Sequence, residues 1–165
     1  MKTLTLEKLK QHVSYDPETG LFTSLSKRYF GKVLGHKNDK GYIEIRIDNV
    51  PYRANRLAWL WMTGEMPTGF VDHENRIKSD NRWLNLRPAN RSLNAANMGL
   101  TKTNSTGARG VSRSKERFSA AIEVNQKRIW LGRHDTADEA AHAYNKAAIA
   151  HFGEYAVLNP IGTDK

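Results

Sequence analysis

The chain has 165 residues and 39% of them are apolar, enough for one domain or two small ones with modest cores. Its 26 Lys and Arg against 17 Asp and Glu give a formal charge of +9, which favours nucleic acid as the partner over an anionic membrane. The chain has no cysteine, no apolar run of spanning length and no lipidation signal, which argues against disulfides, thiolate zinc sites and membrane anchoring. MKTLTLEKLKQ at the start lacks the apolar core of a signal peptide, so we expect a cytoplasmic setting.

The first half of the chain contains alternating and helical apolar patterns. The isoleucines at 43, 45 and 47 alternate with polar residues, as in a half-buried strand. The run RLAWLWMT is apolar nearly all round and stops at Gly64, as a buried helix does. We expect a first helix capped by Thr5, with Leu6, Leu9 and Val13 at helical spacing, and then a turn at 16–20. Strands are expected at Leu21–Leu25, at 41–48 and at Val50–Arg53, the last two joined by a turn at Asp48-Asn49. Helices are expected over Arg56–Thr63 and near Pro88–Met98.

A segment rich in small polar residues divides the chain, and we expect residues 99–106 to be a linker between residues 1–98 and 107–160. After it, Phe118, Ala120, Ile122 and Val124 alternate along one expected strand. The turn would be 125–127, and Ile129 and Leu131 would face inward on the next strand. Thr136 and Glu139 form a capping box for a helix with a small-residue face that stops at Gly153. This predicts a compact strand–strand–helix module.

The segment FVDHENRIKSDNRWLNLRPANRSLNAAN carries the most informative chemistry of the chain. Hydrolysis of a phosphodiester needs an activated water, and His73 is a residue type that can take its proton at neutral pH. Asp72 and Asn94 would offer oxygens to a hard divalent cation such as Mg²⁺ or Mn²⁺. Asn85 would orient the imidazole. Four arginines in the segment suggest a polyanionic substrate: Arg76, Arg82, Arg87 and Arg91.

Each of these residues has an ordinary structural interpretation when it is taken singly. A lone histidine is more often a surface or satisfied core residue than a base. An aspartate is usually a turn or cap residue, and the asparagines at 75, 81, 85, 90, 94 and 97 suit loops and helix caps. The combination at this spacing, in a basic chain, favours the functional interpretation.

The string V-D-H-x-N-x-x-x-S-D-N-R-W-x-N-L-R resembles the HNH endonucleases, in particular the branch of phage and intron homing enzymes. The preceding R-L-A-W and T-G-E-M-P resemble the lead-in of that branch, and the likeness covers about residues 15–98. It implies a ββα-metal site with Asp72 and Asn94 as metal ligands, His73 as general base and Asn85 as its orienting residue. Relatives often have a histidine where this chain has Asn55.

The expected sheet after the linker has an exposed face that suits DNA. By the period of two, Arg117, Ser119, Ala121 and Glu123 face outward on one strand, and Arg128 and Trp130 on the next. An exposed Trp beside arginines is accounted for if a sheet enters the major groove, although a half-buried Trp beside solvated arginines is the plainer alternative. The residues predicted to contact DNA are Arg82, Arg87, Arg91, Arg109, Arg113, Arg117, Arg128, Trp130 and Arg133.

Residues 106–160 resemble the ethylene-response-factor (Apetala-two) DNA-binding domain. The likeness rests on R-G-V, F-S-A-A-I, R-I-W-L-G, D-T-A-D-E-A-A-x-A-Y-N-x-A-A and A-V-L-N-P. It implies a three-stranded antiparallel sheet in the major groove, backed by one helix, with Arg109, Arg117, Arg128 and Trp130 on the DNA-facing sheet. Ser112 and Ala121 replace an arginine and a glutamate of the plant members, so the plant recognition sequence does not carry over.

Together these features predict an α+β chain that acts as a site-specific homing endonuclease. Its partner would be double-stranded DNA, its cofactor Mg²⁺ or Mn²⁺, its setting the bacterial cytoplasm if phage-encoded, and its state a monomer or a homodimer. A non-catalytic DNA-binding regulator that keeps the HNH scaffold is the alternative. An RNA-binding protein is the third possibility, and it is disfavoured because no pair of exposed aromatics suggests base stacking.

Overall fold

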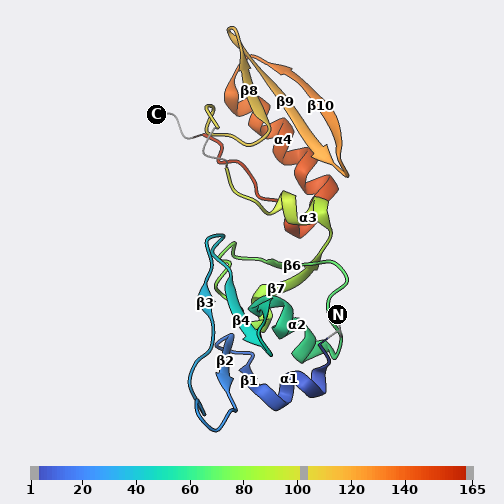
Figure 1. Ribbon diagram of the computed structural model, residues 1–165. Coiled ribbons are helices and arrows are strands. Elements are labelled where there is room, and N and C mark those ends of the chain that lie inside the picture. Colours follow the sequence, from blue (N-terminus) through green and yellow to red (C-terminus); the bar gives the residue numbers. More distant parts are fainter. Residues whose placement is uncertain (1–3, 101–103, 163–165) are drawn as a thin grey trace. The chain divides into compact units, whose positions relative to one another are not determined.

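The computed structural model describes residues 4–100 and 104–162, and its contacts divide the chain into two units, Met1–Ala89 and Asn90–Lys165 (Figure 1). Both units mix helices with small antiparallel sheets, as the predicted α+β class requires. The described parts of the chain contain no helix with the length and apolarity that a membrane span needs. The expected domain limits remain a prediction, and residues 101–103 of the expected linker lie outside the described residues.

The first unit alternates short strands with two helices. Its described residues form three antiparallel sheets: β1 pairs with β2, β4 pairs with both β3 and β5, and β6 pairs with β7. In chain order the elements are α1 Leu6–His12, β1 Val13–Asp16, β2 Leu21–Ser24, β3 His36–Lys37, β4 Ile43–Ile47, β5 Val50–Arg53, α2 Ala54–Thr63, β6 Phe70–His73, the 3₁₀ turn η1 Trp83–Asn85 and β7 Leu86–Ala89.

Local sequence signals account for most of these boundaries. The Thr5 hydroxyl accepts from the Lys8 amide at 3.3 Å and begins α1, as predicted. The turn between β4 and β5 needs two residues with positive φ, and Asp48 and Asn49 adopt 49° and 63°. Helix α2 ends at Gly64, whose φ of 85° is the left-handed conformation that favours glycine. The core beneath these elements is built around Phe22, Leu9, Leu57, Leu60 and Val13.

The segment around Pro88 differs from the prediction of a helix over 88–98. Residues Leu86–Ala89 form β7, and Pro88 lies opposite Val71 of β6. Helix α3, Arg91–Ala96, begins only after Asn90, whose Oδ1 accepts from the Leu93 amide at 2.8 Å. The prediction took proline as a helix opener, but proline also fits a short strand next to a cap residue.

The second unit is a three-stranded antiparallel sheet backed by α4 (Figure 1). Its strand order is β10–β9–β8, and the elements after α3 are β8 Val111–Ser114, β9 Arg117–Val124, β10 Lys127–His134, α4 Ala137–Phe152 and the 3₁₀ turn η2 Gly153–Tyr155. The capping box of Thr136 and Glu139 is present, as predicted. Small residues let α4 lie close to the sheet, and its buried residues are Ala140, Ala141, Tyr144, Asn145, Ala148 and Phe152.

Three details of this sheet differ from the prediction. The turn before β10 is only Asn125-Gln126, with φ of 50° and 66°, so Lys127 already belongs to the strand. Ser119 and Ala121 lie on the outer face by register, yet they are buried. Ala121 sits directly opposite Trp130, and a small side chain next to a large one loses its access to water.

Candidate active site

The Asp72-His73 pair lies at the end of β6 and is held there by pairing with β7. Asp72 lies opposite Arg87, and His73 lies opposite Leu86. Both residues are buried, with 6% and 3% of their surface exposed. A buried carboxylate and a buried imidazole need hydrogen-bond or ion-pair partners within the protein. The residues that contact them are therefore the next part of the candidate site.

Asp72 forms a buried ion pair with Arg87. The Arg87 Nε donates to Asp72 Oδ2 at 3.2 Å, and Arg87 is only 9% exposed. The guanidinium compensates the carboxylate charge inside the first unit. Arg87 was predicted to contact DNA, which stays a prediction, and the structure places its side chain beside the acid.

His73 is held by an amide and an aromatic ring. Its Nε2 lies 3.3 Å from Asn81 Oδ1, and its ring centroid lies 5.9 Å from that of Tyr42. Burial lowers the pKa of His73 below its ordinary value, although the Asn81 bond and the charges of Asp72 and Asp80 raise it. The imidazole is therefore neutral at pH 7, which is the form that accepts a proton.

The loop from 74 to 85 is organised by asparagines. Asn85, predicted to orient the imidazole, uses its Oδ1 to accept from the Asn75 amide at 3.0 Å. Its Nδ2 donates to the Asp80 carbonyl at 2.8 Å, so Asn85 closes the loop on itself. The side chain of Asn81 contacts His73 Nε2. The spacing alone did not single out Asn81, since it is one of six asparagines in the segment.

The loop is also fastened to the N-terminal hairpin. The Tyr15 hydroxyl donates to the Asn81 carbonyl at 2.7 Å, and the Trp83 amide donates to the Pro17 carbonyl at 2.9 Å. A side chain at Gly20 would lie 2.4 Å from the Arg82 nitrogen, so the backbones approach too closely for any other residue.

Arg82, a predicted DNA contact, forms a two-pronged ion pair with Asp80 at 2.8 and 2.6 Å and is half exposed. Arg82 lowers the pKa of Asp80 to about 2.

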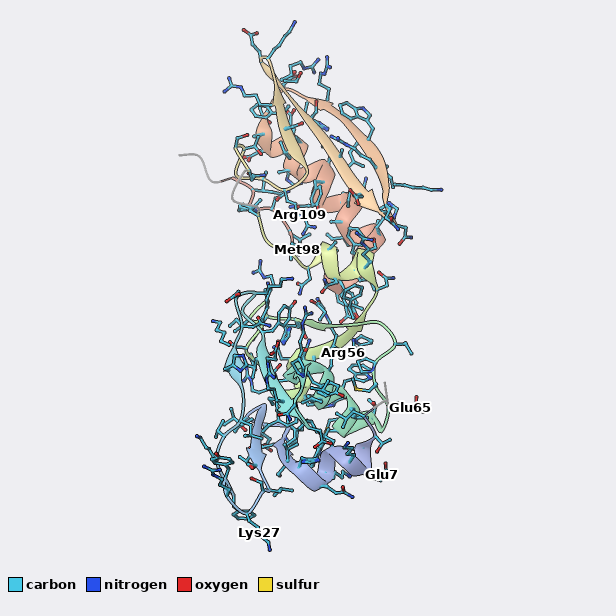
Figure 2. All side chains as sticks on the ribbon, in the orientation of Figure 1. Glu7, Lys27, Arg56, Glu65, Met98 and Arg109 are labelled. Atoms are coloured by element: carbon cyan, nitrogen blue, oxygen red, sulfur yellow. The ribbon has the colours of Figure 1, made fainter. Side chains whose placement is uncertain are left out.

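Asn55, where the HNH resemblance leads us to expect a histidine, makes a buried contact in this structure. It is 3% exposed on α2, and its Nδ2 donates to the Val71 carbonyl at 2.9 Å. The neighbouring Arg56 donates to the carbonyls of Pro67 and Gly69. Helix α2 thereby positions β6 just before Asp72. Arg56 is labelled in Figure 2.

The donor set around Asp72 suits a cation that takes few protein ligands. Within residues 4–100 and 104–162, no group of three or more His, Cys, Asp or Glu side chains is placed to hold a metal. Mg²⁺ keeps several waters and needs only one or two protein oxygens, so a buried carboxylate such as Asp72 fits its chemistry.

Residues 52–96 match the family model of the HNH endonucleases. The match includes the Asp72-His73 pair, the asparagine loop and the β6–β7 hairpin, and it ends with α3. It indicates a nuclease and DNA-binding function for this segment. It does not reach residues 97–165, so it does not bear on the likeness seen in residues 106–160.

The last part of the HNH segment, α3, is built into the second unit. Asn94, a predicted metal ligand, lies on α3 and is partly buried. Leu93 and Ala96 pack into the core of the second unit around Tyr144 and Phe152. The Asn125 amide donates to the Ser92 hydroxyl at 3.1 Å, which ties the helix to the β9–β10 turn.

Arg109 holds the end of α3. Its guanidinium donates to the carbonyls of Ala95, Ala96 and Met98 at and just after the end of the helix. Arg109 and Met98 are labelled in Figure 2. The main chain of Arg109 is bound on both sides by the side-chain amide of Asn159. Arg109 was predicted on the DNA-facing sheet, whereas its charged group here is engaged by the helix.

The outer face of the sheet carries most of the other predicted DNA contacts. Arg128 lies opposite Glu123, Trp130 opposite Ala121 and Arg133 opposite Ser119. Directly paired residues share a face, so these side chains leave the same side of the sheet, away from α4. Trp130 is 58% exposed, as predicted. Arg117 shares this face and pairs with Asp135 at 2.7 Å. Arg113 lies opposite the half-buried Phe118, so its register places it on the other face.

A groove of about 660 Å³ lies within the second unit, between α3 and the sheet. Arg91 and Arg128 line it, together with Glu123 and the turn at Asn125-Gln126. Two exposed arginines give the groove a positive rim, which is the charge that a phosphate backbone requires.

Proposed function

We propose that this protein is a metal-dependent DNA endonuclease of homing type. The observation that carries the proposal is the buried Asp72-His73 pair at the end of β6, inside the segment that matches the HNH endonucleases. A basic chain with an exposed cationic sheet supplies the surface for the polyanion.

His73 acts as the general base in this proposal. The neutral imidazole removes a proton from the attacking water, and Asn81 keeps the ring in place through the 3.3 Å contact with Nε2. Asn85 acts through the loop, because its amide joins Asn75 to Asp80 and so holds the segment that carries Asn81. Hydrolysis would leave 5′-phosphate and 3′-hydroxyl ends, as the HNH resemblance implies.

Asp72 and Asn94 would hold Mg²⁺ or Mn²⁺, following the HNH pattern. When bound, such a cation neutralises charge on the phosphate and on the leaving oxygen. Arg87 keeps the Asp72 carboxylate in a fixed orientation through its ion pair. The buried position of Asp72 strengthens its attraction for a cation, because the surrounding dielectric is low.

The three-stranded sheet addresses DNA in this proposal, as in the Apetala-two domains. The support is the antiparallel order β10–β9–β8 on one helix and the row of exposed cations with Trp130 on the outer face. Base edges in the major groove are read by arginine and by apolar contact with thymine methyls. The nuclease segment would then cut beside a site that the sheet selects.

A non-catalytic DNA-binding regulator is the second candidate. Two observations favour it: Asp72 is already paired with Arg87, and His73 is only 3% exposed. A decayed nuclease would keep the scaffold while its acid and base served only to hold β6. The two candidates differ in whether bound DNA is cut.

The test is incubation of the full chain with genomic DNA and Mg²⁺ or Mn²⁺, followed by mapping of new ends on each strand. The wild type should cut at a few sites, EDTA should abolish cutting, and His73→Ala should slow it about 10²–10⁴-fold with DNA affinity nearly unchanged. Asp72→Ala should weaken the response to the metal. Cutting that survives in EDTA or in His73→Ala excludes the site as drawn, and binding without any cutting supports the regulator. The strand map also distinguishes nicking from double-strand cleavage.

A further inference from the structure

The segment between β2 and β3 forms a projection with an unusual surface. All residues from Leu25 to Val33 are exposed, and the tip reads Lys27-Arg-Tyr-Phe-Gly-Lys32. We call residues 27–32 the basic–aromatic tip. In Figure 1 it belongs to the blue loop that follows β2, and Lys27 is labelled on it in Figure 2.

Hydrogen bonds give this projection a defined shape. The Ser24 amide donates to the Lys32 carbonyl at 2.9 Å, and the Gly31 amide donates to the Ser24 carbonyl at 2.8 Å. Thr23 forms a bridge with Val33, and the Tyr29 amide donates to the Ser26 carbonyl. The loop is therefore a closed hairpin, which presents its tip in one orientation at low entropic cost.

The charge of the projection has one sign. Between Glu18 and Asp39 the chain has no acidic residue, and it has the cations Lys27, Arg28, Lys32 and Lys37. The Arg28 guanidinium lies 5.3 Å and the Lys32 ammonium 5.6 Å from the centre of the Tyr29 ring. Tyr29 thus makes cation–π contacts with both cations, and these contacts hold its ring in place within the tip.

Phe30 stands out in this setting, because 76% of its surface is exposed. An apolar ring in water at the end of a rigid hairpin adds nothing to the core of the first unit. Its cationic neighbours attract a polyanion, and the ring itself suits an apolar, stacked environment. A DNA duplex offers both, phosphates at the outside and base steps within the groove.

We propose that the basic–aromatic tip is a second DNA contact, in which Phe30 enters a base step of the duplex while Lys27, Arg28 and Lys32 lie against the flanking phosphates. Apolar wedges of this kind unstack a step and bend the duplex. The inference rests on the proposed function, since it assumes that DNA is the substrate. It adds a contact in the first unit that is separate from Asp72, His73 and the sheet of the second unit.

The experiment measures binding of the full chain in EDTA to a duplex of about 40 bp of mixed sequence with several TpA steps, which unstack easily. Phe30→Ala should weaken binding about 5- to 150-fold, the range for loss of a stacked ring, without changing the salt slope. A triple Lys27→Ala, Arg28→Ala, Lys32→Ala variant should instead make the slope shallower by up to about three units. Permanganate reactivity of thymines should rise on binding of the wild type and of Phe30→Trp, but not of Phe30→Ala.

Met62→Ala is the matched control, because Met62 is another exposed apolar side chain of the first unit, on α2, at 41%. It should bind like the wild type, and all variants should keep the wild-type melting temperature. Unchanged affinity and unchanged thymine reactivity in Phe30→Ala overturn the wedge. If Phe30→Ala binds the duplex like the wild type but binds a single strand of the same sequence more weakly, the tip is a single-strand stacking site, and this too overturns the wedge. If the proposed nuclease is wrong, the protein does not cut DNA with Mg²⁺. That result does not affect the binding measurements in EDTA, so the two proposals are tested separately.

Discussion

Asn55 joins α2 to β6 through one hydrogen bond, from its Nδ2 to the Val71 carbonyl at 2.9 Å. Its Oδ1 accepts from the Arg56 amide at 3.0 Å, so both ends of the buried amide are used. Because Val71 directly precedes Asp72, this bond sets the position of the strand that carries the candidate acid and base. The residue that departs from the histidine expected from the HNH resemblance thus positions the strand that carries the candidate pair.

Asn55→Ala should destabilise the first unit by about 1–3 kcal/mol, since it leaves the buried Val71 carbonyl without its donor. The melting temperature should fall by several degrees, and cleavage should slow even below the transition. Thermal unfolding and single-turnover cleavage would measure the two effects. Asn55→His, which restores an N–H donor, should recover part of the loss. Equal stability of Asn55→Ala and the wild type would contradict this role.

Asn81 and Asn85 offer a matched pair of substitutions in one loop. Asn85→Ala removes both bonds that close the loop and should cost stability, about 1–3 kcal/mol for each partner left buried. Asn81→Ala should slow single-turnover cleavage about 10- to 100-fold, because the imidazole loses its positioning contact. Rates and urea unfolding should be measured on both variants. A larger loss of rate in a fully folded Asn85→Ala would return the orienting role to Asn85.

The elements with clear local signals could be predicted from the sequence. The isoleucines at 43, 45 and 47, the glycine stop at 64 and the capping box at Thr136 each gave the right element. The Asp72-His73 pair could also be singled out, because an acid next to a histidine in a basic chain has few structural uses.

The partners within the site could not be predicted, because they depend on strand register. Asp72 meets Arg87 only because β6 and β7 pair with a twelve-residue excursion between them, which no local pattern specifies. The contact between Asn81 and His73 likewise depends on the loop backbone, in which Arg76 has a φ of 64°. Arg109 was placed on the sheet by its position after the linker, whereas the carbonyls at the end of α3 engage it.

The ion pair of Asp80 with Arg82 should make stability depend on pH. Arg82 lowers the pKa of Asp80 to about 2, below the usual value near 4 of an unfolded aspartate. The unfolded chain then binds the proton first, so the stabilisation is complete above about pH 5 and is lost as the pH falls toward 2. Asp80→Asn should therefore be less stable than the wild type at pH 6, and the gap should shrink between pH 5 and pH 3 in urea unfolding. A constant gap would show that the charge of Asp80 contributes nothing.

Arg109 should act on α3 rather than on DNA bases. Arg109→Ala removes the guanidinium donor from the carbonyls of Ala95, Ala96 and Met98, and a six-residue helix has little stability of its own. Amide exchange in α3 should accelerate, and cleavage should fall with it if Asn94 is a ligand. Arg109→Lys should rescue little, because one ammonium cannot reproduce the planar fork. Normal protection of α3 together with altered site choice would instead identify Arg109 as a reader of DNA.

Arg128 is the strongest candidate for base reading, because it leaves the outer face of the sheet beside Trp130 and lines the groove next to α3. If it reads a guanine, Arg128→Ala should cost about 1–3 kcal/mol at one or two base pairs and little elsewhere. Affinity for a set of single-base variants of a mapped cleavage site would show this pattern. Lys146→Ala removes one exposed charge from α4, which packs on the other face, and should leave the pattern intact. A uniform loss across all variants, with a salt slope shallower by about one unit, would mean that Arg128 contacts only phosphate. Specificity would then have to come from Trp130, from Arg133 or from the shape of the DNA.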